Sequence, residues 1–227
     1  MSSDKKPSHP ATGSGGSRTD CAVAPCEKPG LKTALGKDVD EAIEKCPKFA
    51  EKLKDLQDKG WSFEYGKKGG GSYCSKDDKK IVLDENQKGN TASVVETMAH
   101  ESGHAGYAQD PYVPPKGLTK DEYARTNANR GLKDEGEATL SNVELKKCLK
   151  DNGGIEIGVA GAQSAEYEKI AKKYPNTTDR EKARQEIADI FADKEHPSTD
   201  PKKTYREYYE KTYRDAYDKL PEKDKKP

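Results

Sequence analysis

The stretch SVVETMAHESGH, residues 93–104, carries an apolar pattern that leads directly into two histidines. Ser93 and Glu96 have the spacing of a capping box, which marks the start of a helix. Apolar residues then recur at helical steps, at Val94, Val95, Met98 and Ala99. On this helix His100 and His104 lie one turn apart on the same face, where two imidazoles can bind one metal ion.

Histidine is scarce in this chain, which has four: His9, His100, His104 and His196. Two of them at ligand spacing, with Glu101 between them, argue against a chance motif in an ordinary surface helix, which is the alternative interpretation. Glu101 is the type of residue that accepts a proton from water at such a site.

A catalytic zinc site normally has three protein ligands and an open position, so a third ligand is expected downstream. The best candidate lies in DEGEA, residues 134–138, at the start of a second helix that could pack against the first. Glu135 is the predicted ligand and Glu137 the near alternative. His196 and Asp110 fit less well, Asp110 because it is too close in sequence to turn back. The competing interpretation of Glu135 is an acidic residue stabilised near a helix N-terminus by the helix dipole.

HESGH followed by Glu135-Gly136-Glu137-Ala138 resembles the gluzincin branch of the HExxH metallopeptidases, in which a glutamate on a following helix, often in a Glu-x-x-Ala context, completes the zinc site. The resemblance covers about the central third of the chain. It implies a zincin-like fold and a zinc-dependent metallopeptidase. The expected Zn²⁺ ligands are then His100, His104 and Glu135, and the expected general base is Glu101.

In such an enzyme Glu101 takes a proton from a water that Zn²⁺ polarises, and passes it to the leaving amine. The donor that stabilises the oxyanion stays open among Tyr107, Tyr112, Tyr123 and His196. The stretch Ile81–Leu83 resembles the zincin edge strand that pairs with an extended substrate, which favours a peptide over a small ester. Gly103 costs about 1 kcal/mol of helix propensity relative to alanine, so it either permits a close approach or is simply tolerated.

More narrowly, the polar N-terminal segment, AHESGHAGY and DEGEA are similar to zinc-peptidase toxin domains of bacterial type VI secretion effectors. That resemblance implies a secreted toxin that is delivered to a target cell without a Sec signal peptide, or that is cytoplasmic before export. The expected partners are a protein or peptide substrate, the secretion apparatus and an immunity protein. Two other functions stay open: a non-catalytic, zinc-stabilised protein-binding module, and a zinc amidase acting on cell-wall peptide, although no wall-binding repeat is recognisable.

The composition excludes some classes of function. The chain has 227 residues, and its 41 basic residues balance its 41 acidic ones, so no basic field favours nucleic acid. Hydrophobic residues make up 31%, and no apolar run approaches the roughly 20 residues of a membrane span. The N-terminus lacks the apolar core of a Sec signal peptide.

Periodicity predicts an α+β, helix-dominated single domain with a small antiparallel sheet. Residues 1–36 are expected to form a flexible leader, residues 37–220 the zincin-like domain and residues 221–227 a disordered tail. The expected elements are a helix over about 39–58, short strands near Trp61–Tyr65, Tyr73 and Ile81–Leu83, the motif helix, helices near 119–130 and 133–150, and three later helices. The last of these carries a stripe of tyrosines, which we interpret as a packing face: Tyr205, Tyr209, Tyr213 and Tyr217.

The five cysteines allow disulfides without requiring them. Cys21 could pair with Cys26, and Cys46 with Cys74, in an oxidising compartment. Cys148 then remains single. Buried or idle thiols in a cytosolic protein are the alternative.

Overall fold

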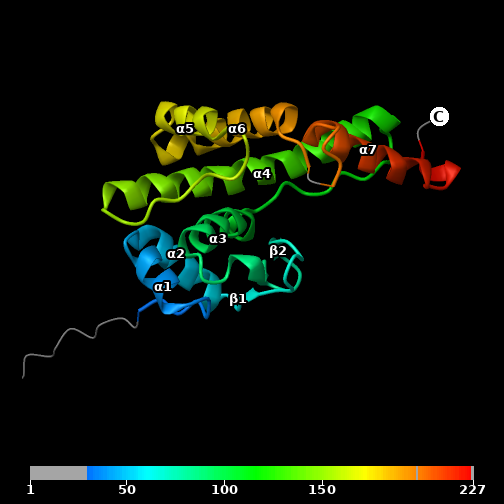
Figure 1. The fold of residues 1–227 in the computed structure, drawn as a ribbon. Helices are drawn as coiled ribbons and strands as arrows, with labels where there is room; N and C mark the ends of the chain where they lie inside the picture. Colours follow the sequence, from blue (N-terminus) through cyan, green and yellow to red (C-terminus); the bar gives the residue numbers. More distant parts are fainter. Residues whose placement is uncertain (1–29, 198, 226–227) are drawn as a thin grey trace, which may run out of the picture.

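A computed structural model describes residues 30–197 and 199–225 (Figure 1). It has the predicted α+β class, with helices dominating and one small sheet. The helices are α1 (Lys37–Glu44), α2 (Pro47–Asp58), α3 (Thr91–Gly106), α4 (Lys120–Asp151), α5 (Ser164–Lys173), α6 (Arg180–Lys194) and α7 (Tyr205–Asp218). The strands are β1 (Ser62–Tyr65), β2 (Tyr73–Ser75) and β3 (Lys80–Leu83).

The long helix α4 is the central element of the fold. In Figure 1 α3 lies along one side of α4, α5 and α6 lie on the other side, and α7 lies near its first turns. One apolar core joins α1, α2, α3 and the sheet to the end of α4, and a second lies between α4, α5 and α6. Each helix within the described residues is too short or too polar to cross a bilayer.

Two helix predictions were wrong in their boundaries. The helix expected over 39–58 is interrupted, because Pro47 lacks an amide hydrogen and is the first residue of α2. The helices expected at 119–130 and 133–150 form a single 32-residue helix that begins with a capping box of Thr119 and Glu122. Gly131 lies inside this helix without ending it, and the ring of Tyr209 packs 3.7 Å from the position of its missing Cβ.

The motif helix α3 starts three residues earlier than predicted. Asn90 caps it, because its side-chain oxygen accepts a hydrogen bond from the amide of Ser93. Glu96 therefore takes no part in a capping box and instead accepts a hydrogen bond from the amide of Gly158, on the segment after α4.

The sheet is mixed, so the expected antiparallel sheet was wrong. The strand order is β1-β3-β2, with β1 parallel and β2 antiparallel to β3. Asp84, just after β3, accepts hydrogen bonds from the amides of Gly69 and Gly71 and so anchors the connection between β1 and β2. Because β1 and β2 pair with opposite edges of β3, the connection from β1 to β2 must pass from one edge of β3 to the other. The short turn of the sheet is the one between β2 and β3, which are antiparallel.

Both ends of the described chain contact the folded domain. Leu31 and Leu35, within the segment expected to be a leader, are buried in the first core. The leader's remaining residues, 1–29, lie outside the described residues. Near the C-terminus, residues Glu222–Asp224 form a short 3-10 turn, and Lys225 donates a hydrogen bond to the carbonyl of Asp218.

One disulfide links Cys46, at the start of α2, to Cys148, near the end of α4, with a Cα–Cα distance of 5.9 Å. The expected pairing of Cys46 with Cys74 was therefore wrong, because Cys74 is a free, half-buried thiol on β2. The sequence could not show that α4 brings Cys148, 102 positions away, next to Cys46. Cys21 and Cys26 are outside the described residues.

Candidate metal centre

The candidate metal centre lies where α3 crosses α4. Gly103 of α3 faces Ala138 of α4 so closely that a Cβ on Gly103 would lie 2.5 Å from the Cα of Ala138. Such a separation is impossible for any other residue at 103 without a shift of backbone. The close approach predicted for Gly103 is thus confirmed, and it brings the histidines of α3 against the acidic turn of α4.

Three side chains converge at this crossing. The Nε2 atoms of His100 and His104 lie 3.6 and 3.7 Å from the same oxygen, Oε2 of Glu135. One ligand atom from each residue lies within 4.8 Å of the others, so the cluster could bind a metal ion. Ligands about 2.0–2.1 Å from a tetrahedral zinc lie roughly 3.3 Å apart. The two Nε2–Oε2 distances therefore exceed that spacing by only a few tenths of an ångström.

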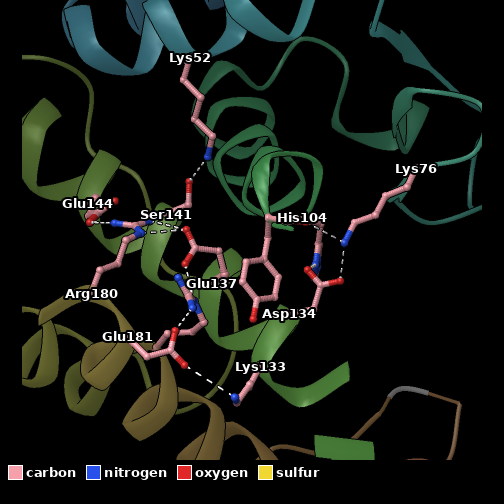
Figure 2. Close-up of polar contacts among 12 residues, drawn as sticks. Lys52, Lys76, His104, Lys133, Asp134, Glu137, Ser141, Glu144, Arg180 and Glu181 are labelled. Atoms are coloured by element: carbon pink, nitrogen blue, oxygen red, sulfur yellow. Dashed lines mark hydrogen bonds and ion pairs between the residues drawn. The ribbon is translucent and has the colours of Figure 1, made fainter. Parts of the chain in front are cut away.

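Asp134 fixes the orientation of one imidazole. Its Oδ1 lies 2.9 Å from Nδ1 of His104, and its Oδ2 accepts a 2.8 Å hydrogen bond from Lys76 (Figure 2). A hydrogen bond from Nδ1–H to a carboxylate leaves Nε2 free to bind metal, as is usual for histidine ligands. Nδ1 of His100 is buried without a hydrogen-bond partner within the described residues, so packing and the contact of its Nε2 with Glu135 orient that ring.

The charges of the cluster favour an ionised Glu135. Burial raises the pKa of its carboxyl group, but His100, His104 and the hydroxyl of Tyr209 outweigh burial and lower the pKa overall. For His104, burial lowers the pKa, while Asp134 and Glu135 outweigh that effect and raise it overall. A proton on His104 therefore competes with a metal ion for Nε2.

Glu101 lies beside the cluster and is 8% exposed. Burial raises the pKa of its carboxyl group, and the two neighbouring imidazoles oppose that shift without cancelling it. Within the part of the chain that the structure describes, no donor forms a hydrogen bond to this carboxylate. It is thus a buried base without a direct partner, next to three potential metal ligands.

Glu137, the alternative third ligand, points away from the histidines. Its carboxylate accepts hydrogen bonds from Arg180 at 2.6 and 3.0 Å and from Arg184 at 2.8 Å, and Arg180 also pairs with Glu144 (Figure 2). These contacts join α4 to α6. Glu137 is therefore a structural carboxylate, and the choice of Glu135 over Glu137 is favoured by the geometry.

The weaker ligand candidates lie elsewhere. His196 is exposed, and its Nδ1 lies 2.9 Å from the carbonyl oxygen of Lys203. Asp110 forms an ion pair with Lys133. Neither residue belongs to the cluster.

The candidate oxyanion donors lie in different parts of the fold. The hydroxyls of Tyr112 and Tyr123 lie 2.7 Å apart and bond to each other near the start of α4. Tyr107 directly follows α3, with the cations of Lys76 and Arg184 over its ring. Of the four candidates, Tyr107 is the closest in the chain to the histidines.

The edge-strand prediction needs a correction. The stretch Ile81–Leu83 lies in β3, which is the central strand, with both of its edges paired to β1 and β2. The strands at the two edges are β1 and β2, and β2 packs against α3. Burial raises the pKa of the Cys74 thiol on β2 to about 12, and the nearby Glu101 carboxylate contributes to this rise.

Two residues of this centre were not assigned a role from the sequence. Asp134 stands directly before Glu135, but nothing in the string DEGEA distinguishes a residue that orients a histidine from a solvated acid. Tyr209 belongs to the tyrosine stripe, whose spacing predicts packing, and its hydroxyl donates a 3.1 Å hydrogen bond to Oε1 of Glu135. Only the docking of α7 on α4 reveals that contact.

Comparisons with known proteins add no relative: no family model, no curated protein and no solved structure matches this chain.

Proposed function

We propose that this protein is a zinc-dependent metallopeptidase in which His100, His104 and Glu135 bind Zn²⁺ and Glu101 is the general base. The observation that carries the proposal is that both Nε2 atoms converge on one oxygen of Glu135. This convergence depends on the close packing of α3 against α4, which the absence of a side chain at Gly103 allows. A histidine pair and one carboxylate form a common ligand set of catalytic zinc.

Asp134 supports the metal assignment independently of the motif. A structural ion pair would not need the second nitrogen of His104 to be held by a further carboxylate, whereas metal-binding histidines usually have such a partner. When bound, Zn²⁺ would supply the Lewis acidity that activates water and polarises a carbonyl.

Glu101 is suited to moving a proton. Its raised pKa lies closer to neutral pH than that of an exposed carboxylate, and bases act best when their pKa is near the working pH. It would accept a proton from the attacking water and deliver it to the leaving amine. Because its carboxylate is not engaged by a hydrogen bond within the described residues, no contact must break first.

A peptide substrate is favoured by the sheet. The outer edge of β2 has no strand partner within the described residues, and β2 packs against the motif helix. An extended peptide could add to this edge by main-chain hydrogen bonds. The role first expected of Ile81–Leu83 is therefore proposed for Tyr73–Ser75.

We also propose that the protein works in an oxidising compartment, as a secreted effector would after delivery. The Cys46–Cys148 disulfide supports this location, because such bonds persist mainly outside the reducing cytosol. Recognition by the secretion apparatus and by an immunity protein belongs to the same proposal.

The first test is metal content, measured by elemental mass spectrometry on the wild type, Glu101→Gln and His104→Ala. We expect near one zinc per chain in the wild type and in Glu101→Gln, and much less in His104→Ala. Iron in place of zinc would contradict the hydrolase, because two histidines and a carboxylate also bind Fe²⁺ in oxygenases. Absence of metal from all three proteins after incubation with zinc would reject the proposal.

The second test is cleavage of a diverse peptide library, read by mass spectrometry, with cell-wall stem peptides in a parallel reaction. Wild-type cleavage that Glu101→Gln abolishes while retaining zinc would support the peptidase. Cleavage of the stem peptides alone would favour the amidase. Zinc without cleavage of either substrate would favour the non-catalytic binding module.

A further inference from the structure

We infer that Tyr209 is a positioning residue that makes Glu135 present a single carboxylate oxygen to the metal. This inference rests on the proposed metal site and adds a third helix, α7, to it. The sequence placed Tyr209 in a packing stripe, so the role comes from the geometry alone.

The two oxygens of Glu135 have different partners. Oε1 accepts a 3.1 Å hydrogen bond from the hydroxyl of Tyr209, whereas Oε2 is the oxygen that faces Nε2 of His100 and of His104. A phenol has an ordinary pKa of about 10 and is a hydrogen-bond donor at neutral pH. Tyr209 therefore holds Oε1 by a hydrogen bond, and Oε2 is the oxygen that can bind the metal.

The surroundings of Tyr209 keep its ring in place. Gly131, one turn before Glu135 on α4, leaves room for the ring, which lies 3.7 Å from the position that a Cβ would take. The rings of Tyr205 and Tyr208 lie 6.0 and 6.1 Å from that of Tyr209, centre to centre. A ring confined by α4 and by its own helix directs its hydroxyl at Oε1 with little freedom to turn away.

The consequence concerns the number of ligand atoms. A carboxylate with one oxygen engaged by a donor binds a metal through the other oxygen, so a two-histidine, one-carboxylate set keeps a coordination position open, as catalytic sites require. Without the hydroxyl, Oε1 is free to turn toward the metal as an additional ligand, which raises the coordination number above four and crowds that position. Tyr209 would thus preserve the open position and not merely strengthen binding.

Tyr209→Phe tests this directly, because it removes one oxygen atom and leaves the ring. Tyr208→Phe is the matched control: it removes a hydroxyl from the neighbouring residue of α7, where no hydrogen bond to Glu135 is formed. Each protein would be loaded with Co²⁺, whose visible absorption is strong at four-coordinate sites and weak at six-coordinate ones. Zinc affinity would be measured by competition with a chromogenic chelator.

We expect Tyr209→Phe to bind zinc about 10- to 100-fold more weakly, as is typical when an outer-shell partner is lost. Its cobalt absorption should weaken, and its kcat should fall more than its KM rises. Tyr208→Phe should match the wild type in all three measurements.

An unchanged cobalt spectrum and zinc affinity in Tyr209→Phe would overturn the inference and leave the metallopeptidase proposal intact. A wild type that binds neither zinc nor cobalt would overturn both. A loss of affinity of equal size in Tyr209→Phe and Tyr208→Phe would also overturn the inference, because it would show a general effect of weaker packing of α7.

Discussion

Nδ1 of His104 lies 2.9 Å from Oδ1 of Asp134, and the residue after Asp134 supplies the carboxylate that faces Nε2 of the same ring. Consecutive residues on a helix project about 100° apart, so one turn of α4 can contact both nitrogens of one imidazole. Asp134 thus orients the ring, and Glu135 completes the cluster.

Replacing Asp134 with asparagine should weaken zinc binding by about 10- to 100-fold, because the amide cannot hold the ring as a carboxylate does. The measurement is competition with a chromogenic chelator at fixed pH. Asp110→Asn is the control, since Asp110 pairs with Lys133 away from the cluster. Equal affinity in Asp134→Asn and the wild type would show that His104 needs no such partner.

Gly103→Ala should destabilise the protein by about 1–3 kcal/mol and reduce its zinc affinity, because the new Cβ would overlap the backbone of Ala138 and force α3 away from α4. Gly106→Ala is the matched control on the same helix. There a Cβ would lie 3.3 Å from the flexible Lys52 side chain, which can move. Urea unfolding of both variants decides the point, and equal stability of the two would contradict the close-packing argument.

The disulfide between Cys46 and Cys148 should contribute about 4–5 kcal/mol by restricting the unfolded chain, because it closes a loop of about 100 residues. Cys148→Ser should lower the urea midpoint by a corresponding amount and make it insensitive to reductant. Cys74→Ser, which removes a free thiol, should leave the midpoint sensitive to reductant. A wild-type midpoint that reductant does not move would show that the bond has no stabilising role.

Local signals predicted the helices well and the long-range arrangement poorly. The apolar spacing before His100 predicted α3, and the break at Pro47 could have been predicted from the missing amide hydrogen. The mixed sheet could not be predicted in this way, because the direction of β1 relative to β3 depends on the loop between β1 and β2. Asp84, which follows β3, anchors that loop by accepting hydrogen bonds from its amides. The pairing of Cys46 with Cys148 likewise depends on where the end of α4 lies.

The candidate metal ligands were predictable because ligand chemistry limits the choice of residue. His100, His104 and Glu135 were selected by type and spacing, and the structure brings all three together. Asp134 and Tyr209 act through those ligands, and aspartate and tyrosine are common on helix surfaces for other reasons. Their roles depend on helix packing, which periodicity does not describe.

Lys52 of α2 is a charged residue in an unfavourable position between helices. Its Nζ donates a 3.0 Å hydrogen bond to Oγ of Ser141 on α4 (Figure 2). Burial lowers the pKa of this amine to about 8, against the opposing effect of the Glu137 carboxylate. At pH 7 the folded protein therefore holds a charge that water would solvate better.

Lys52→Met should stabilise the protein at pH 7 by about 1–3 kcal/mol, because it removes the cost of burying that charge. Between pH 8 and 10.5 the unfolded chain keeps the Lys52 proton that the folded protein has lost, so this residue makes wild-type stability rise with pH. The advantage of Lys52→Met should shrink over the same range. Urea unfolding from pH 7 to 10.5 measures both effects, with the exposed Lys48→Met as control. A constant difference between Lys52→Met and the wild type across that range would show that Lys52 is not titrating there.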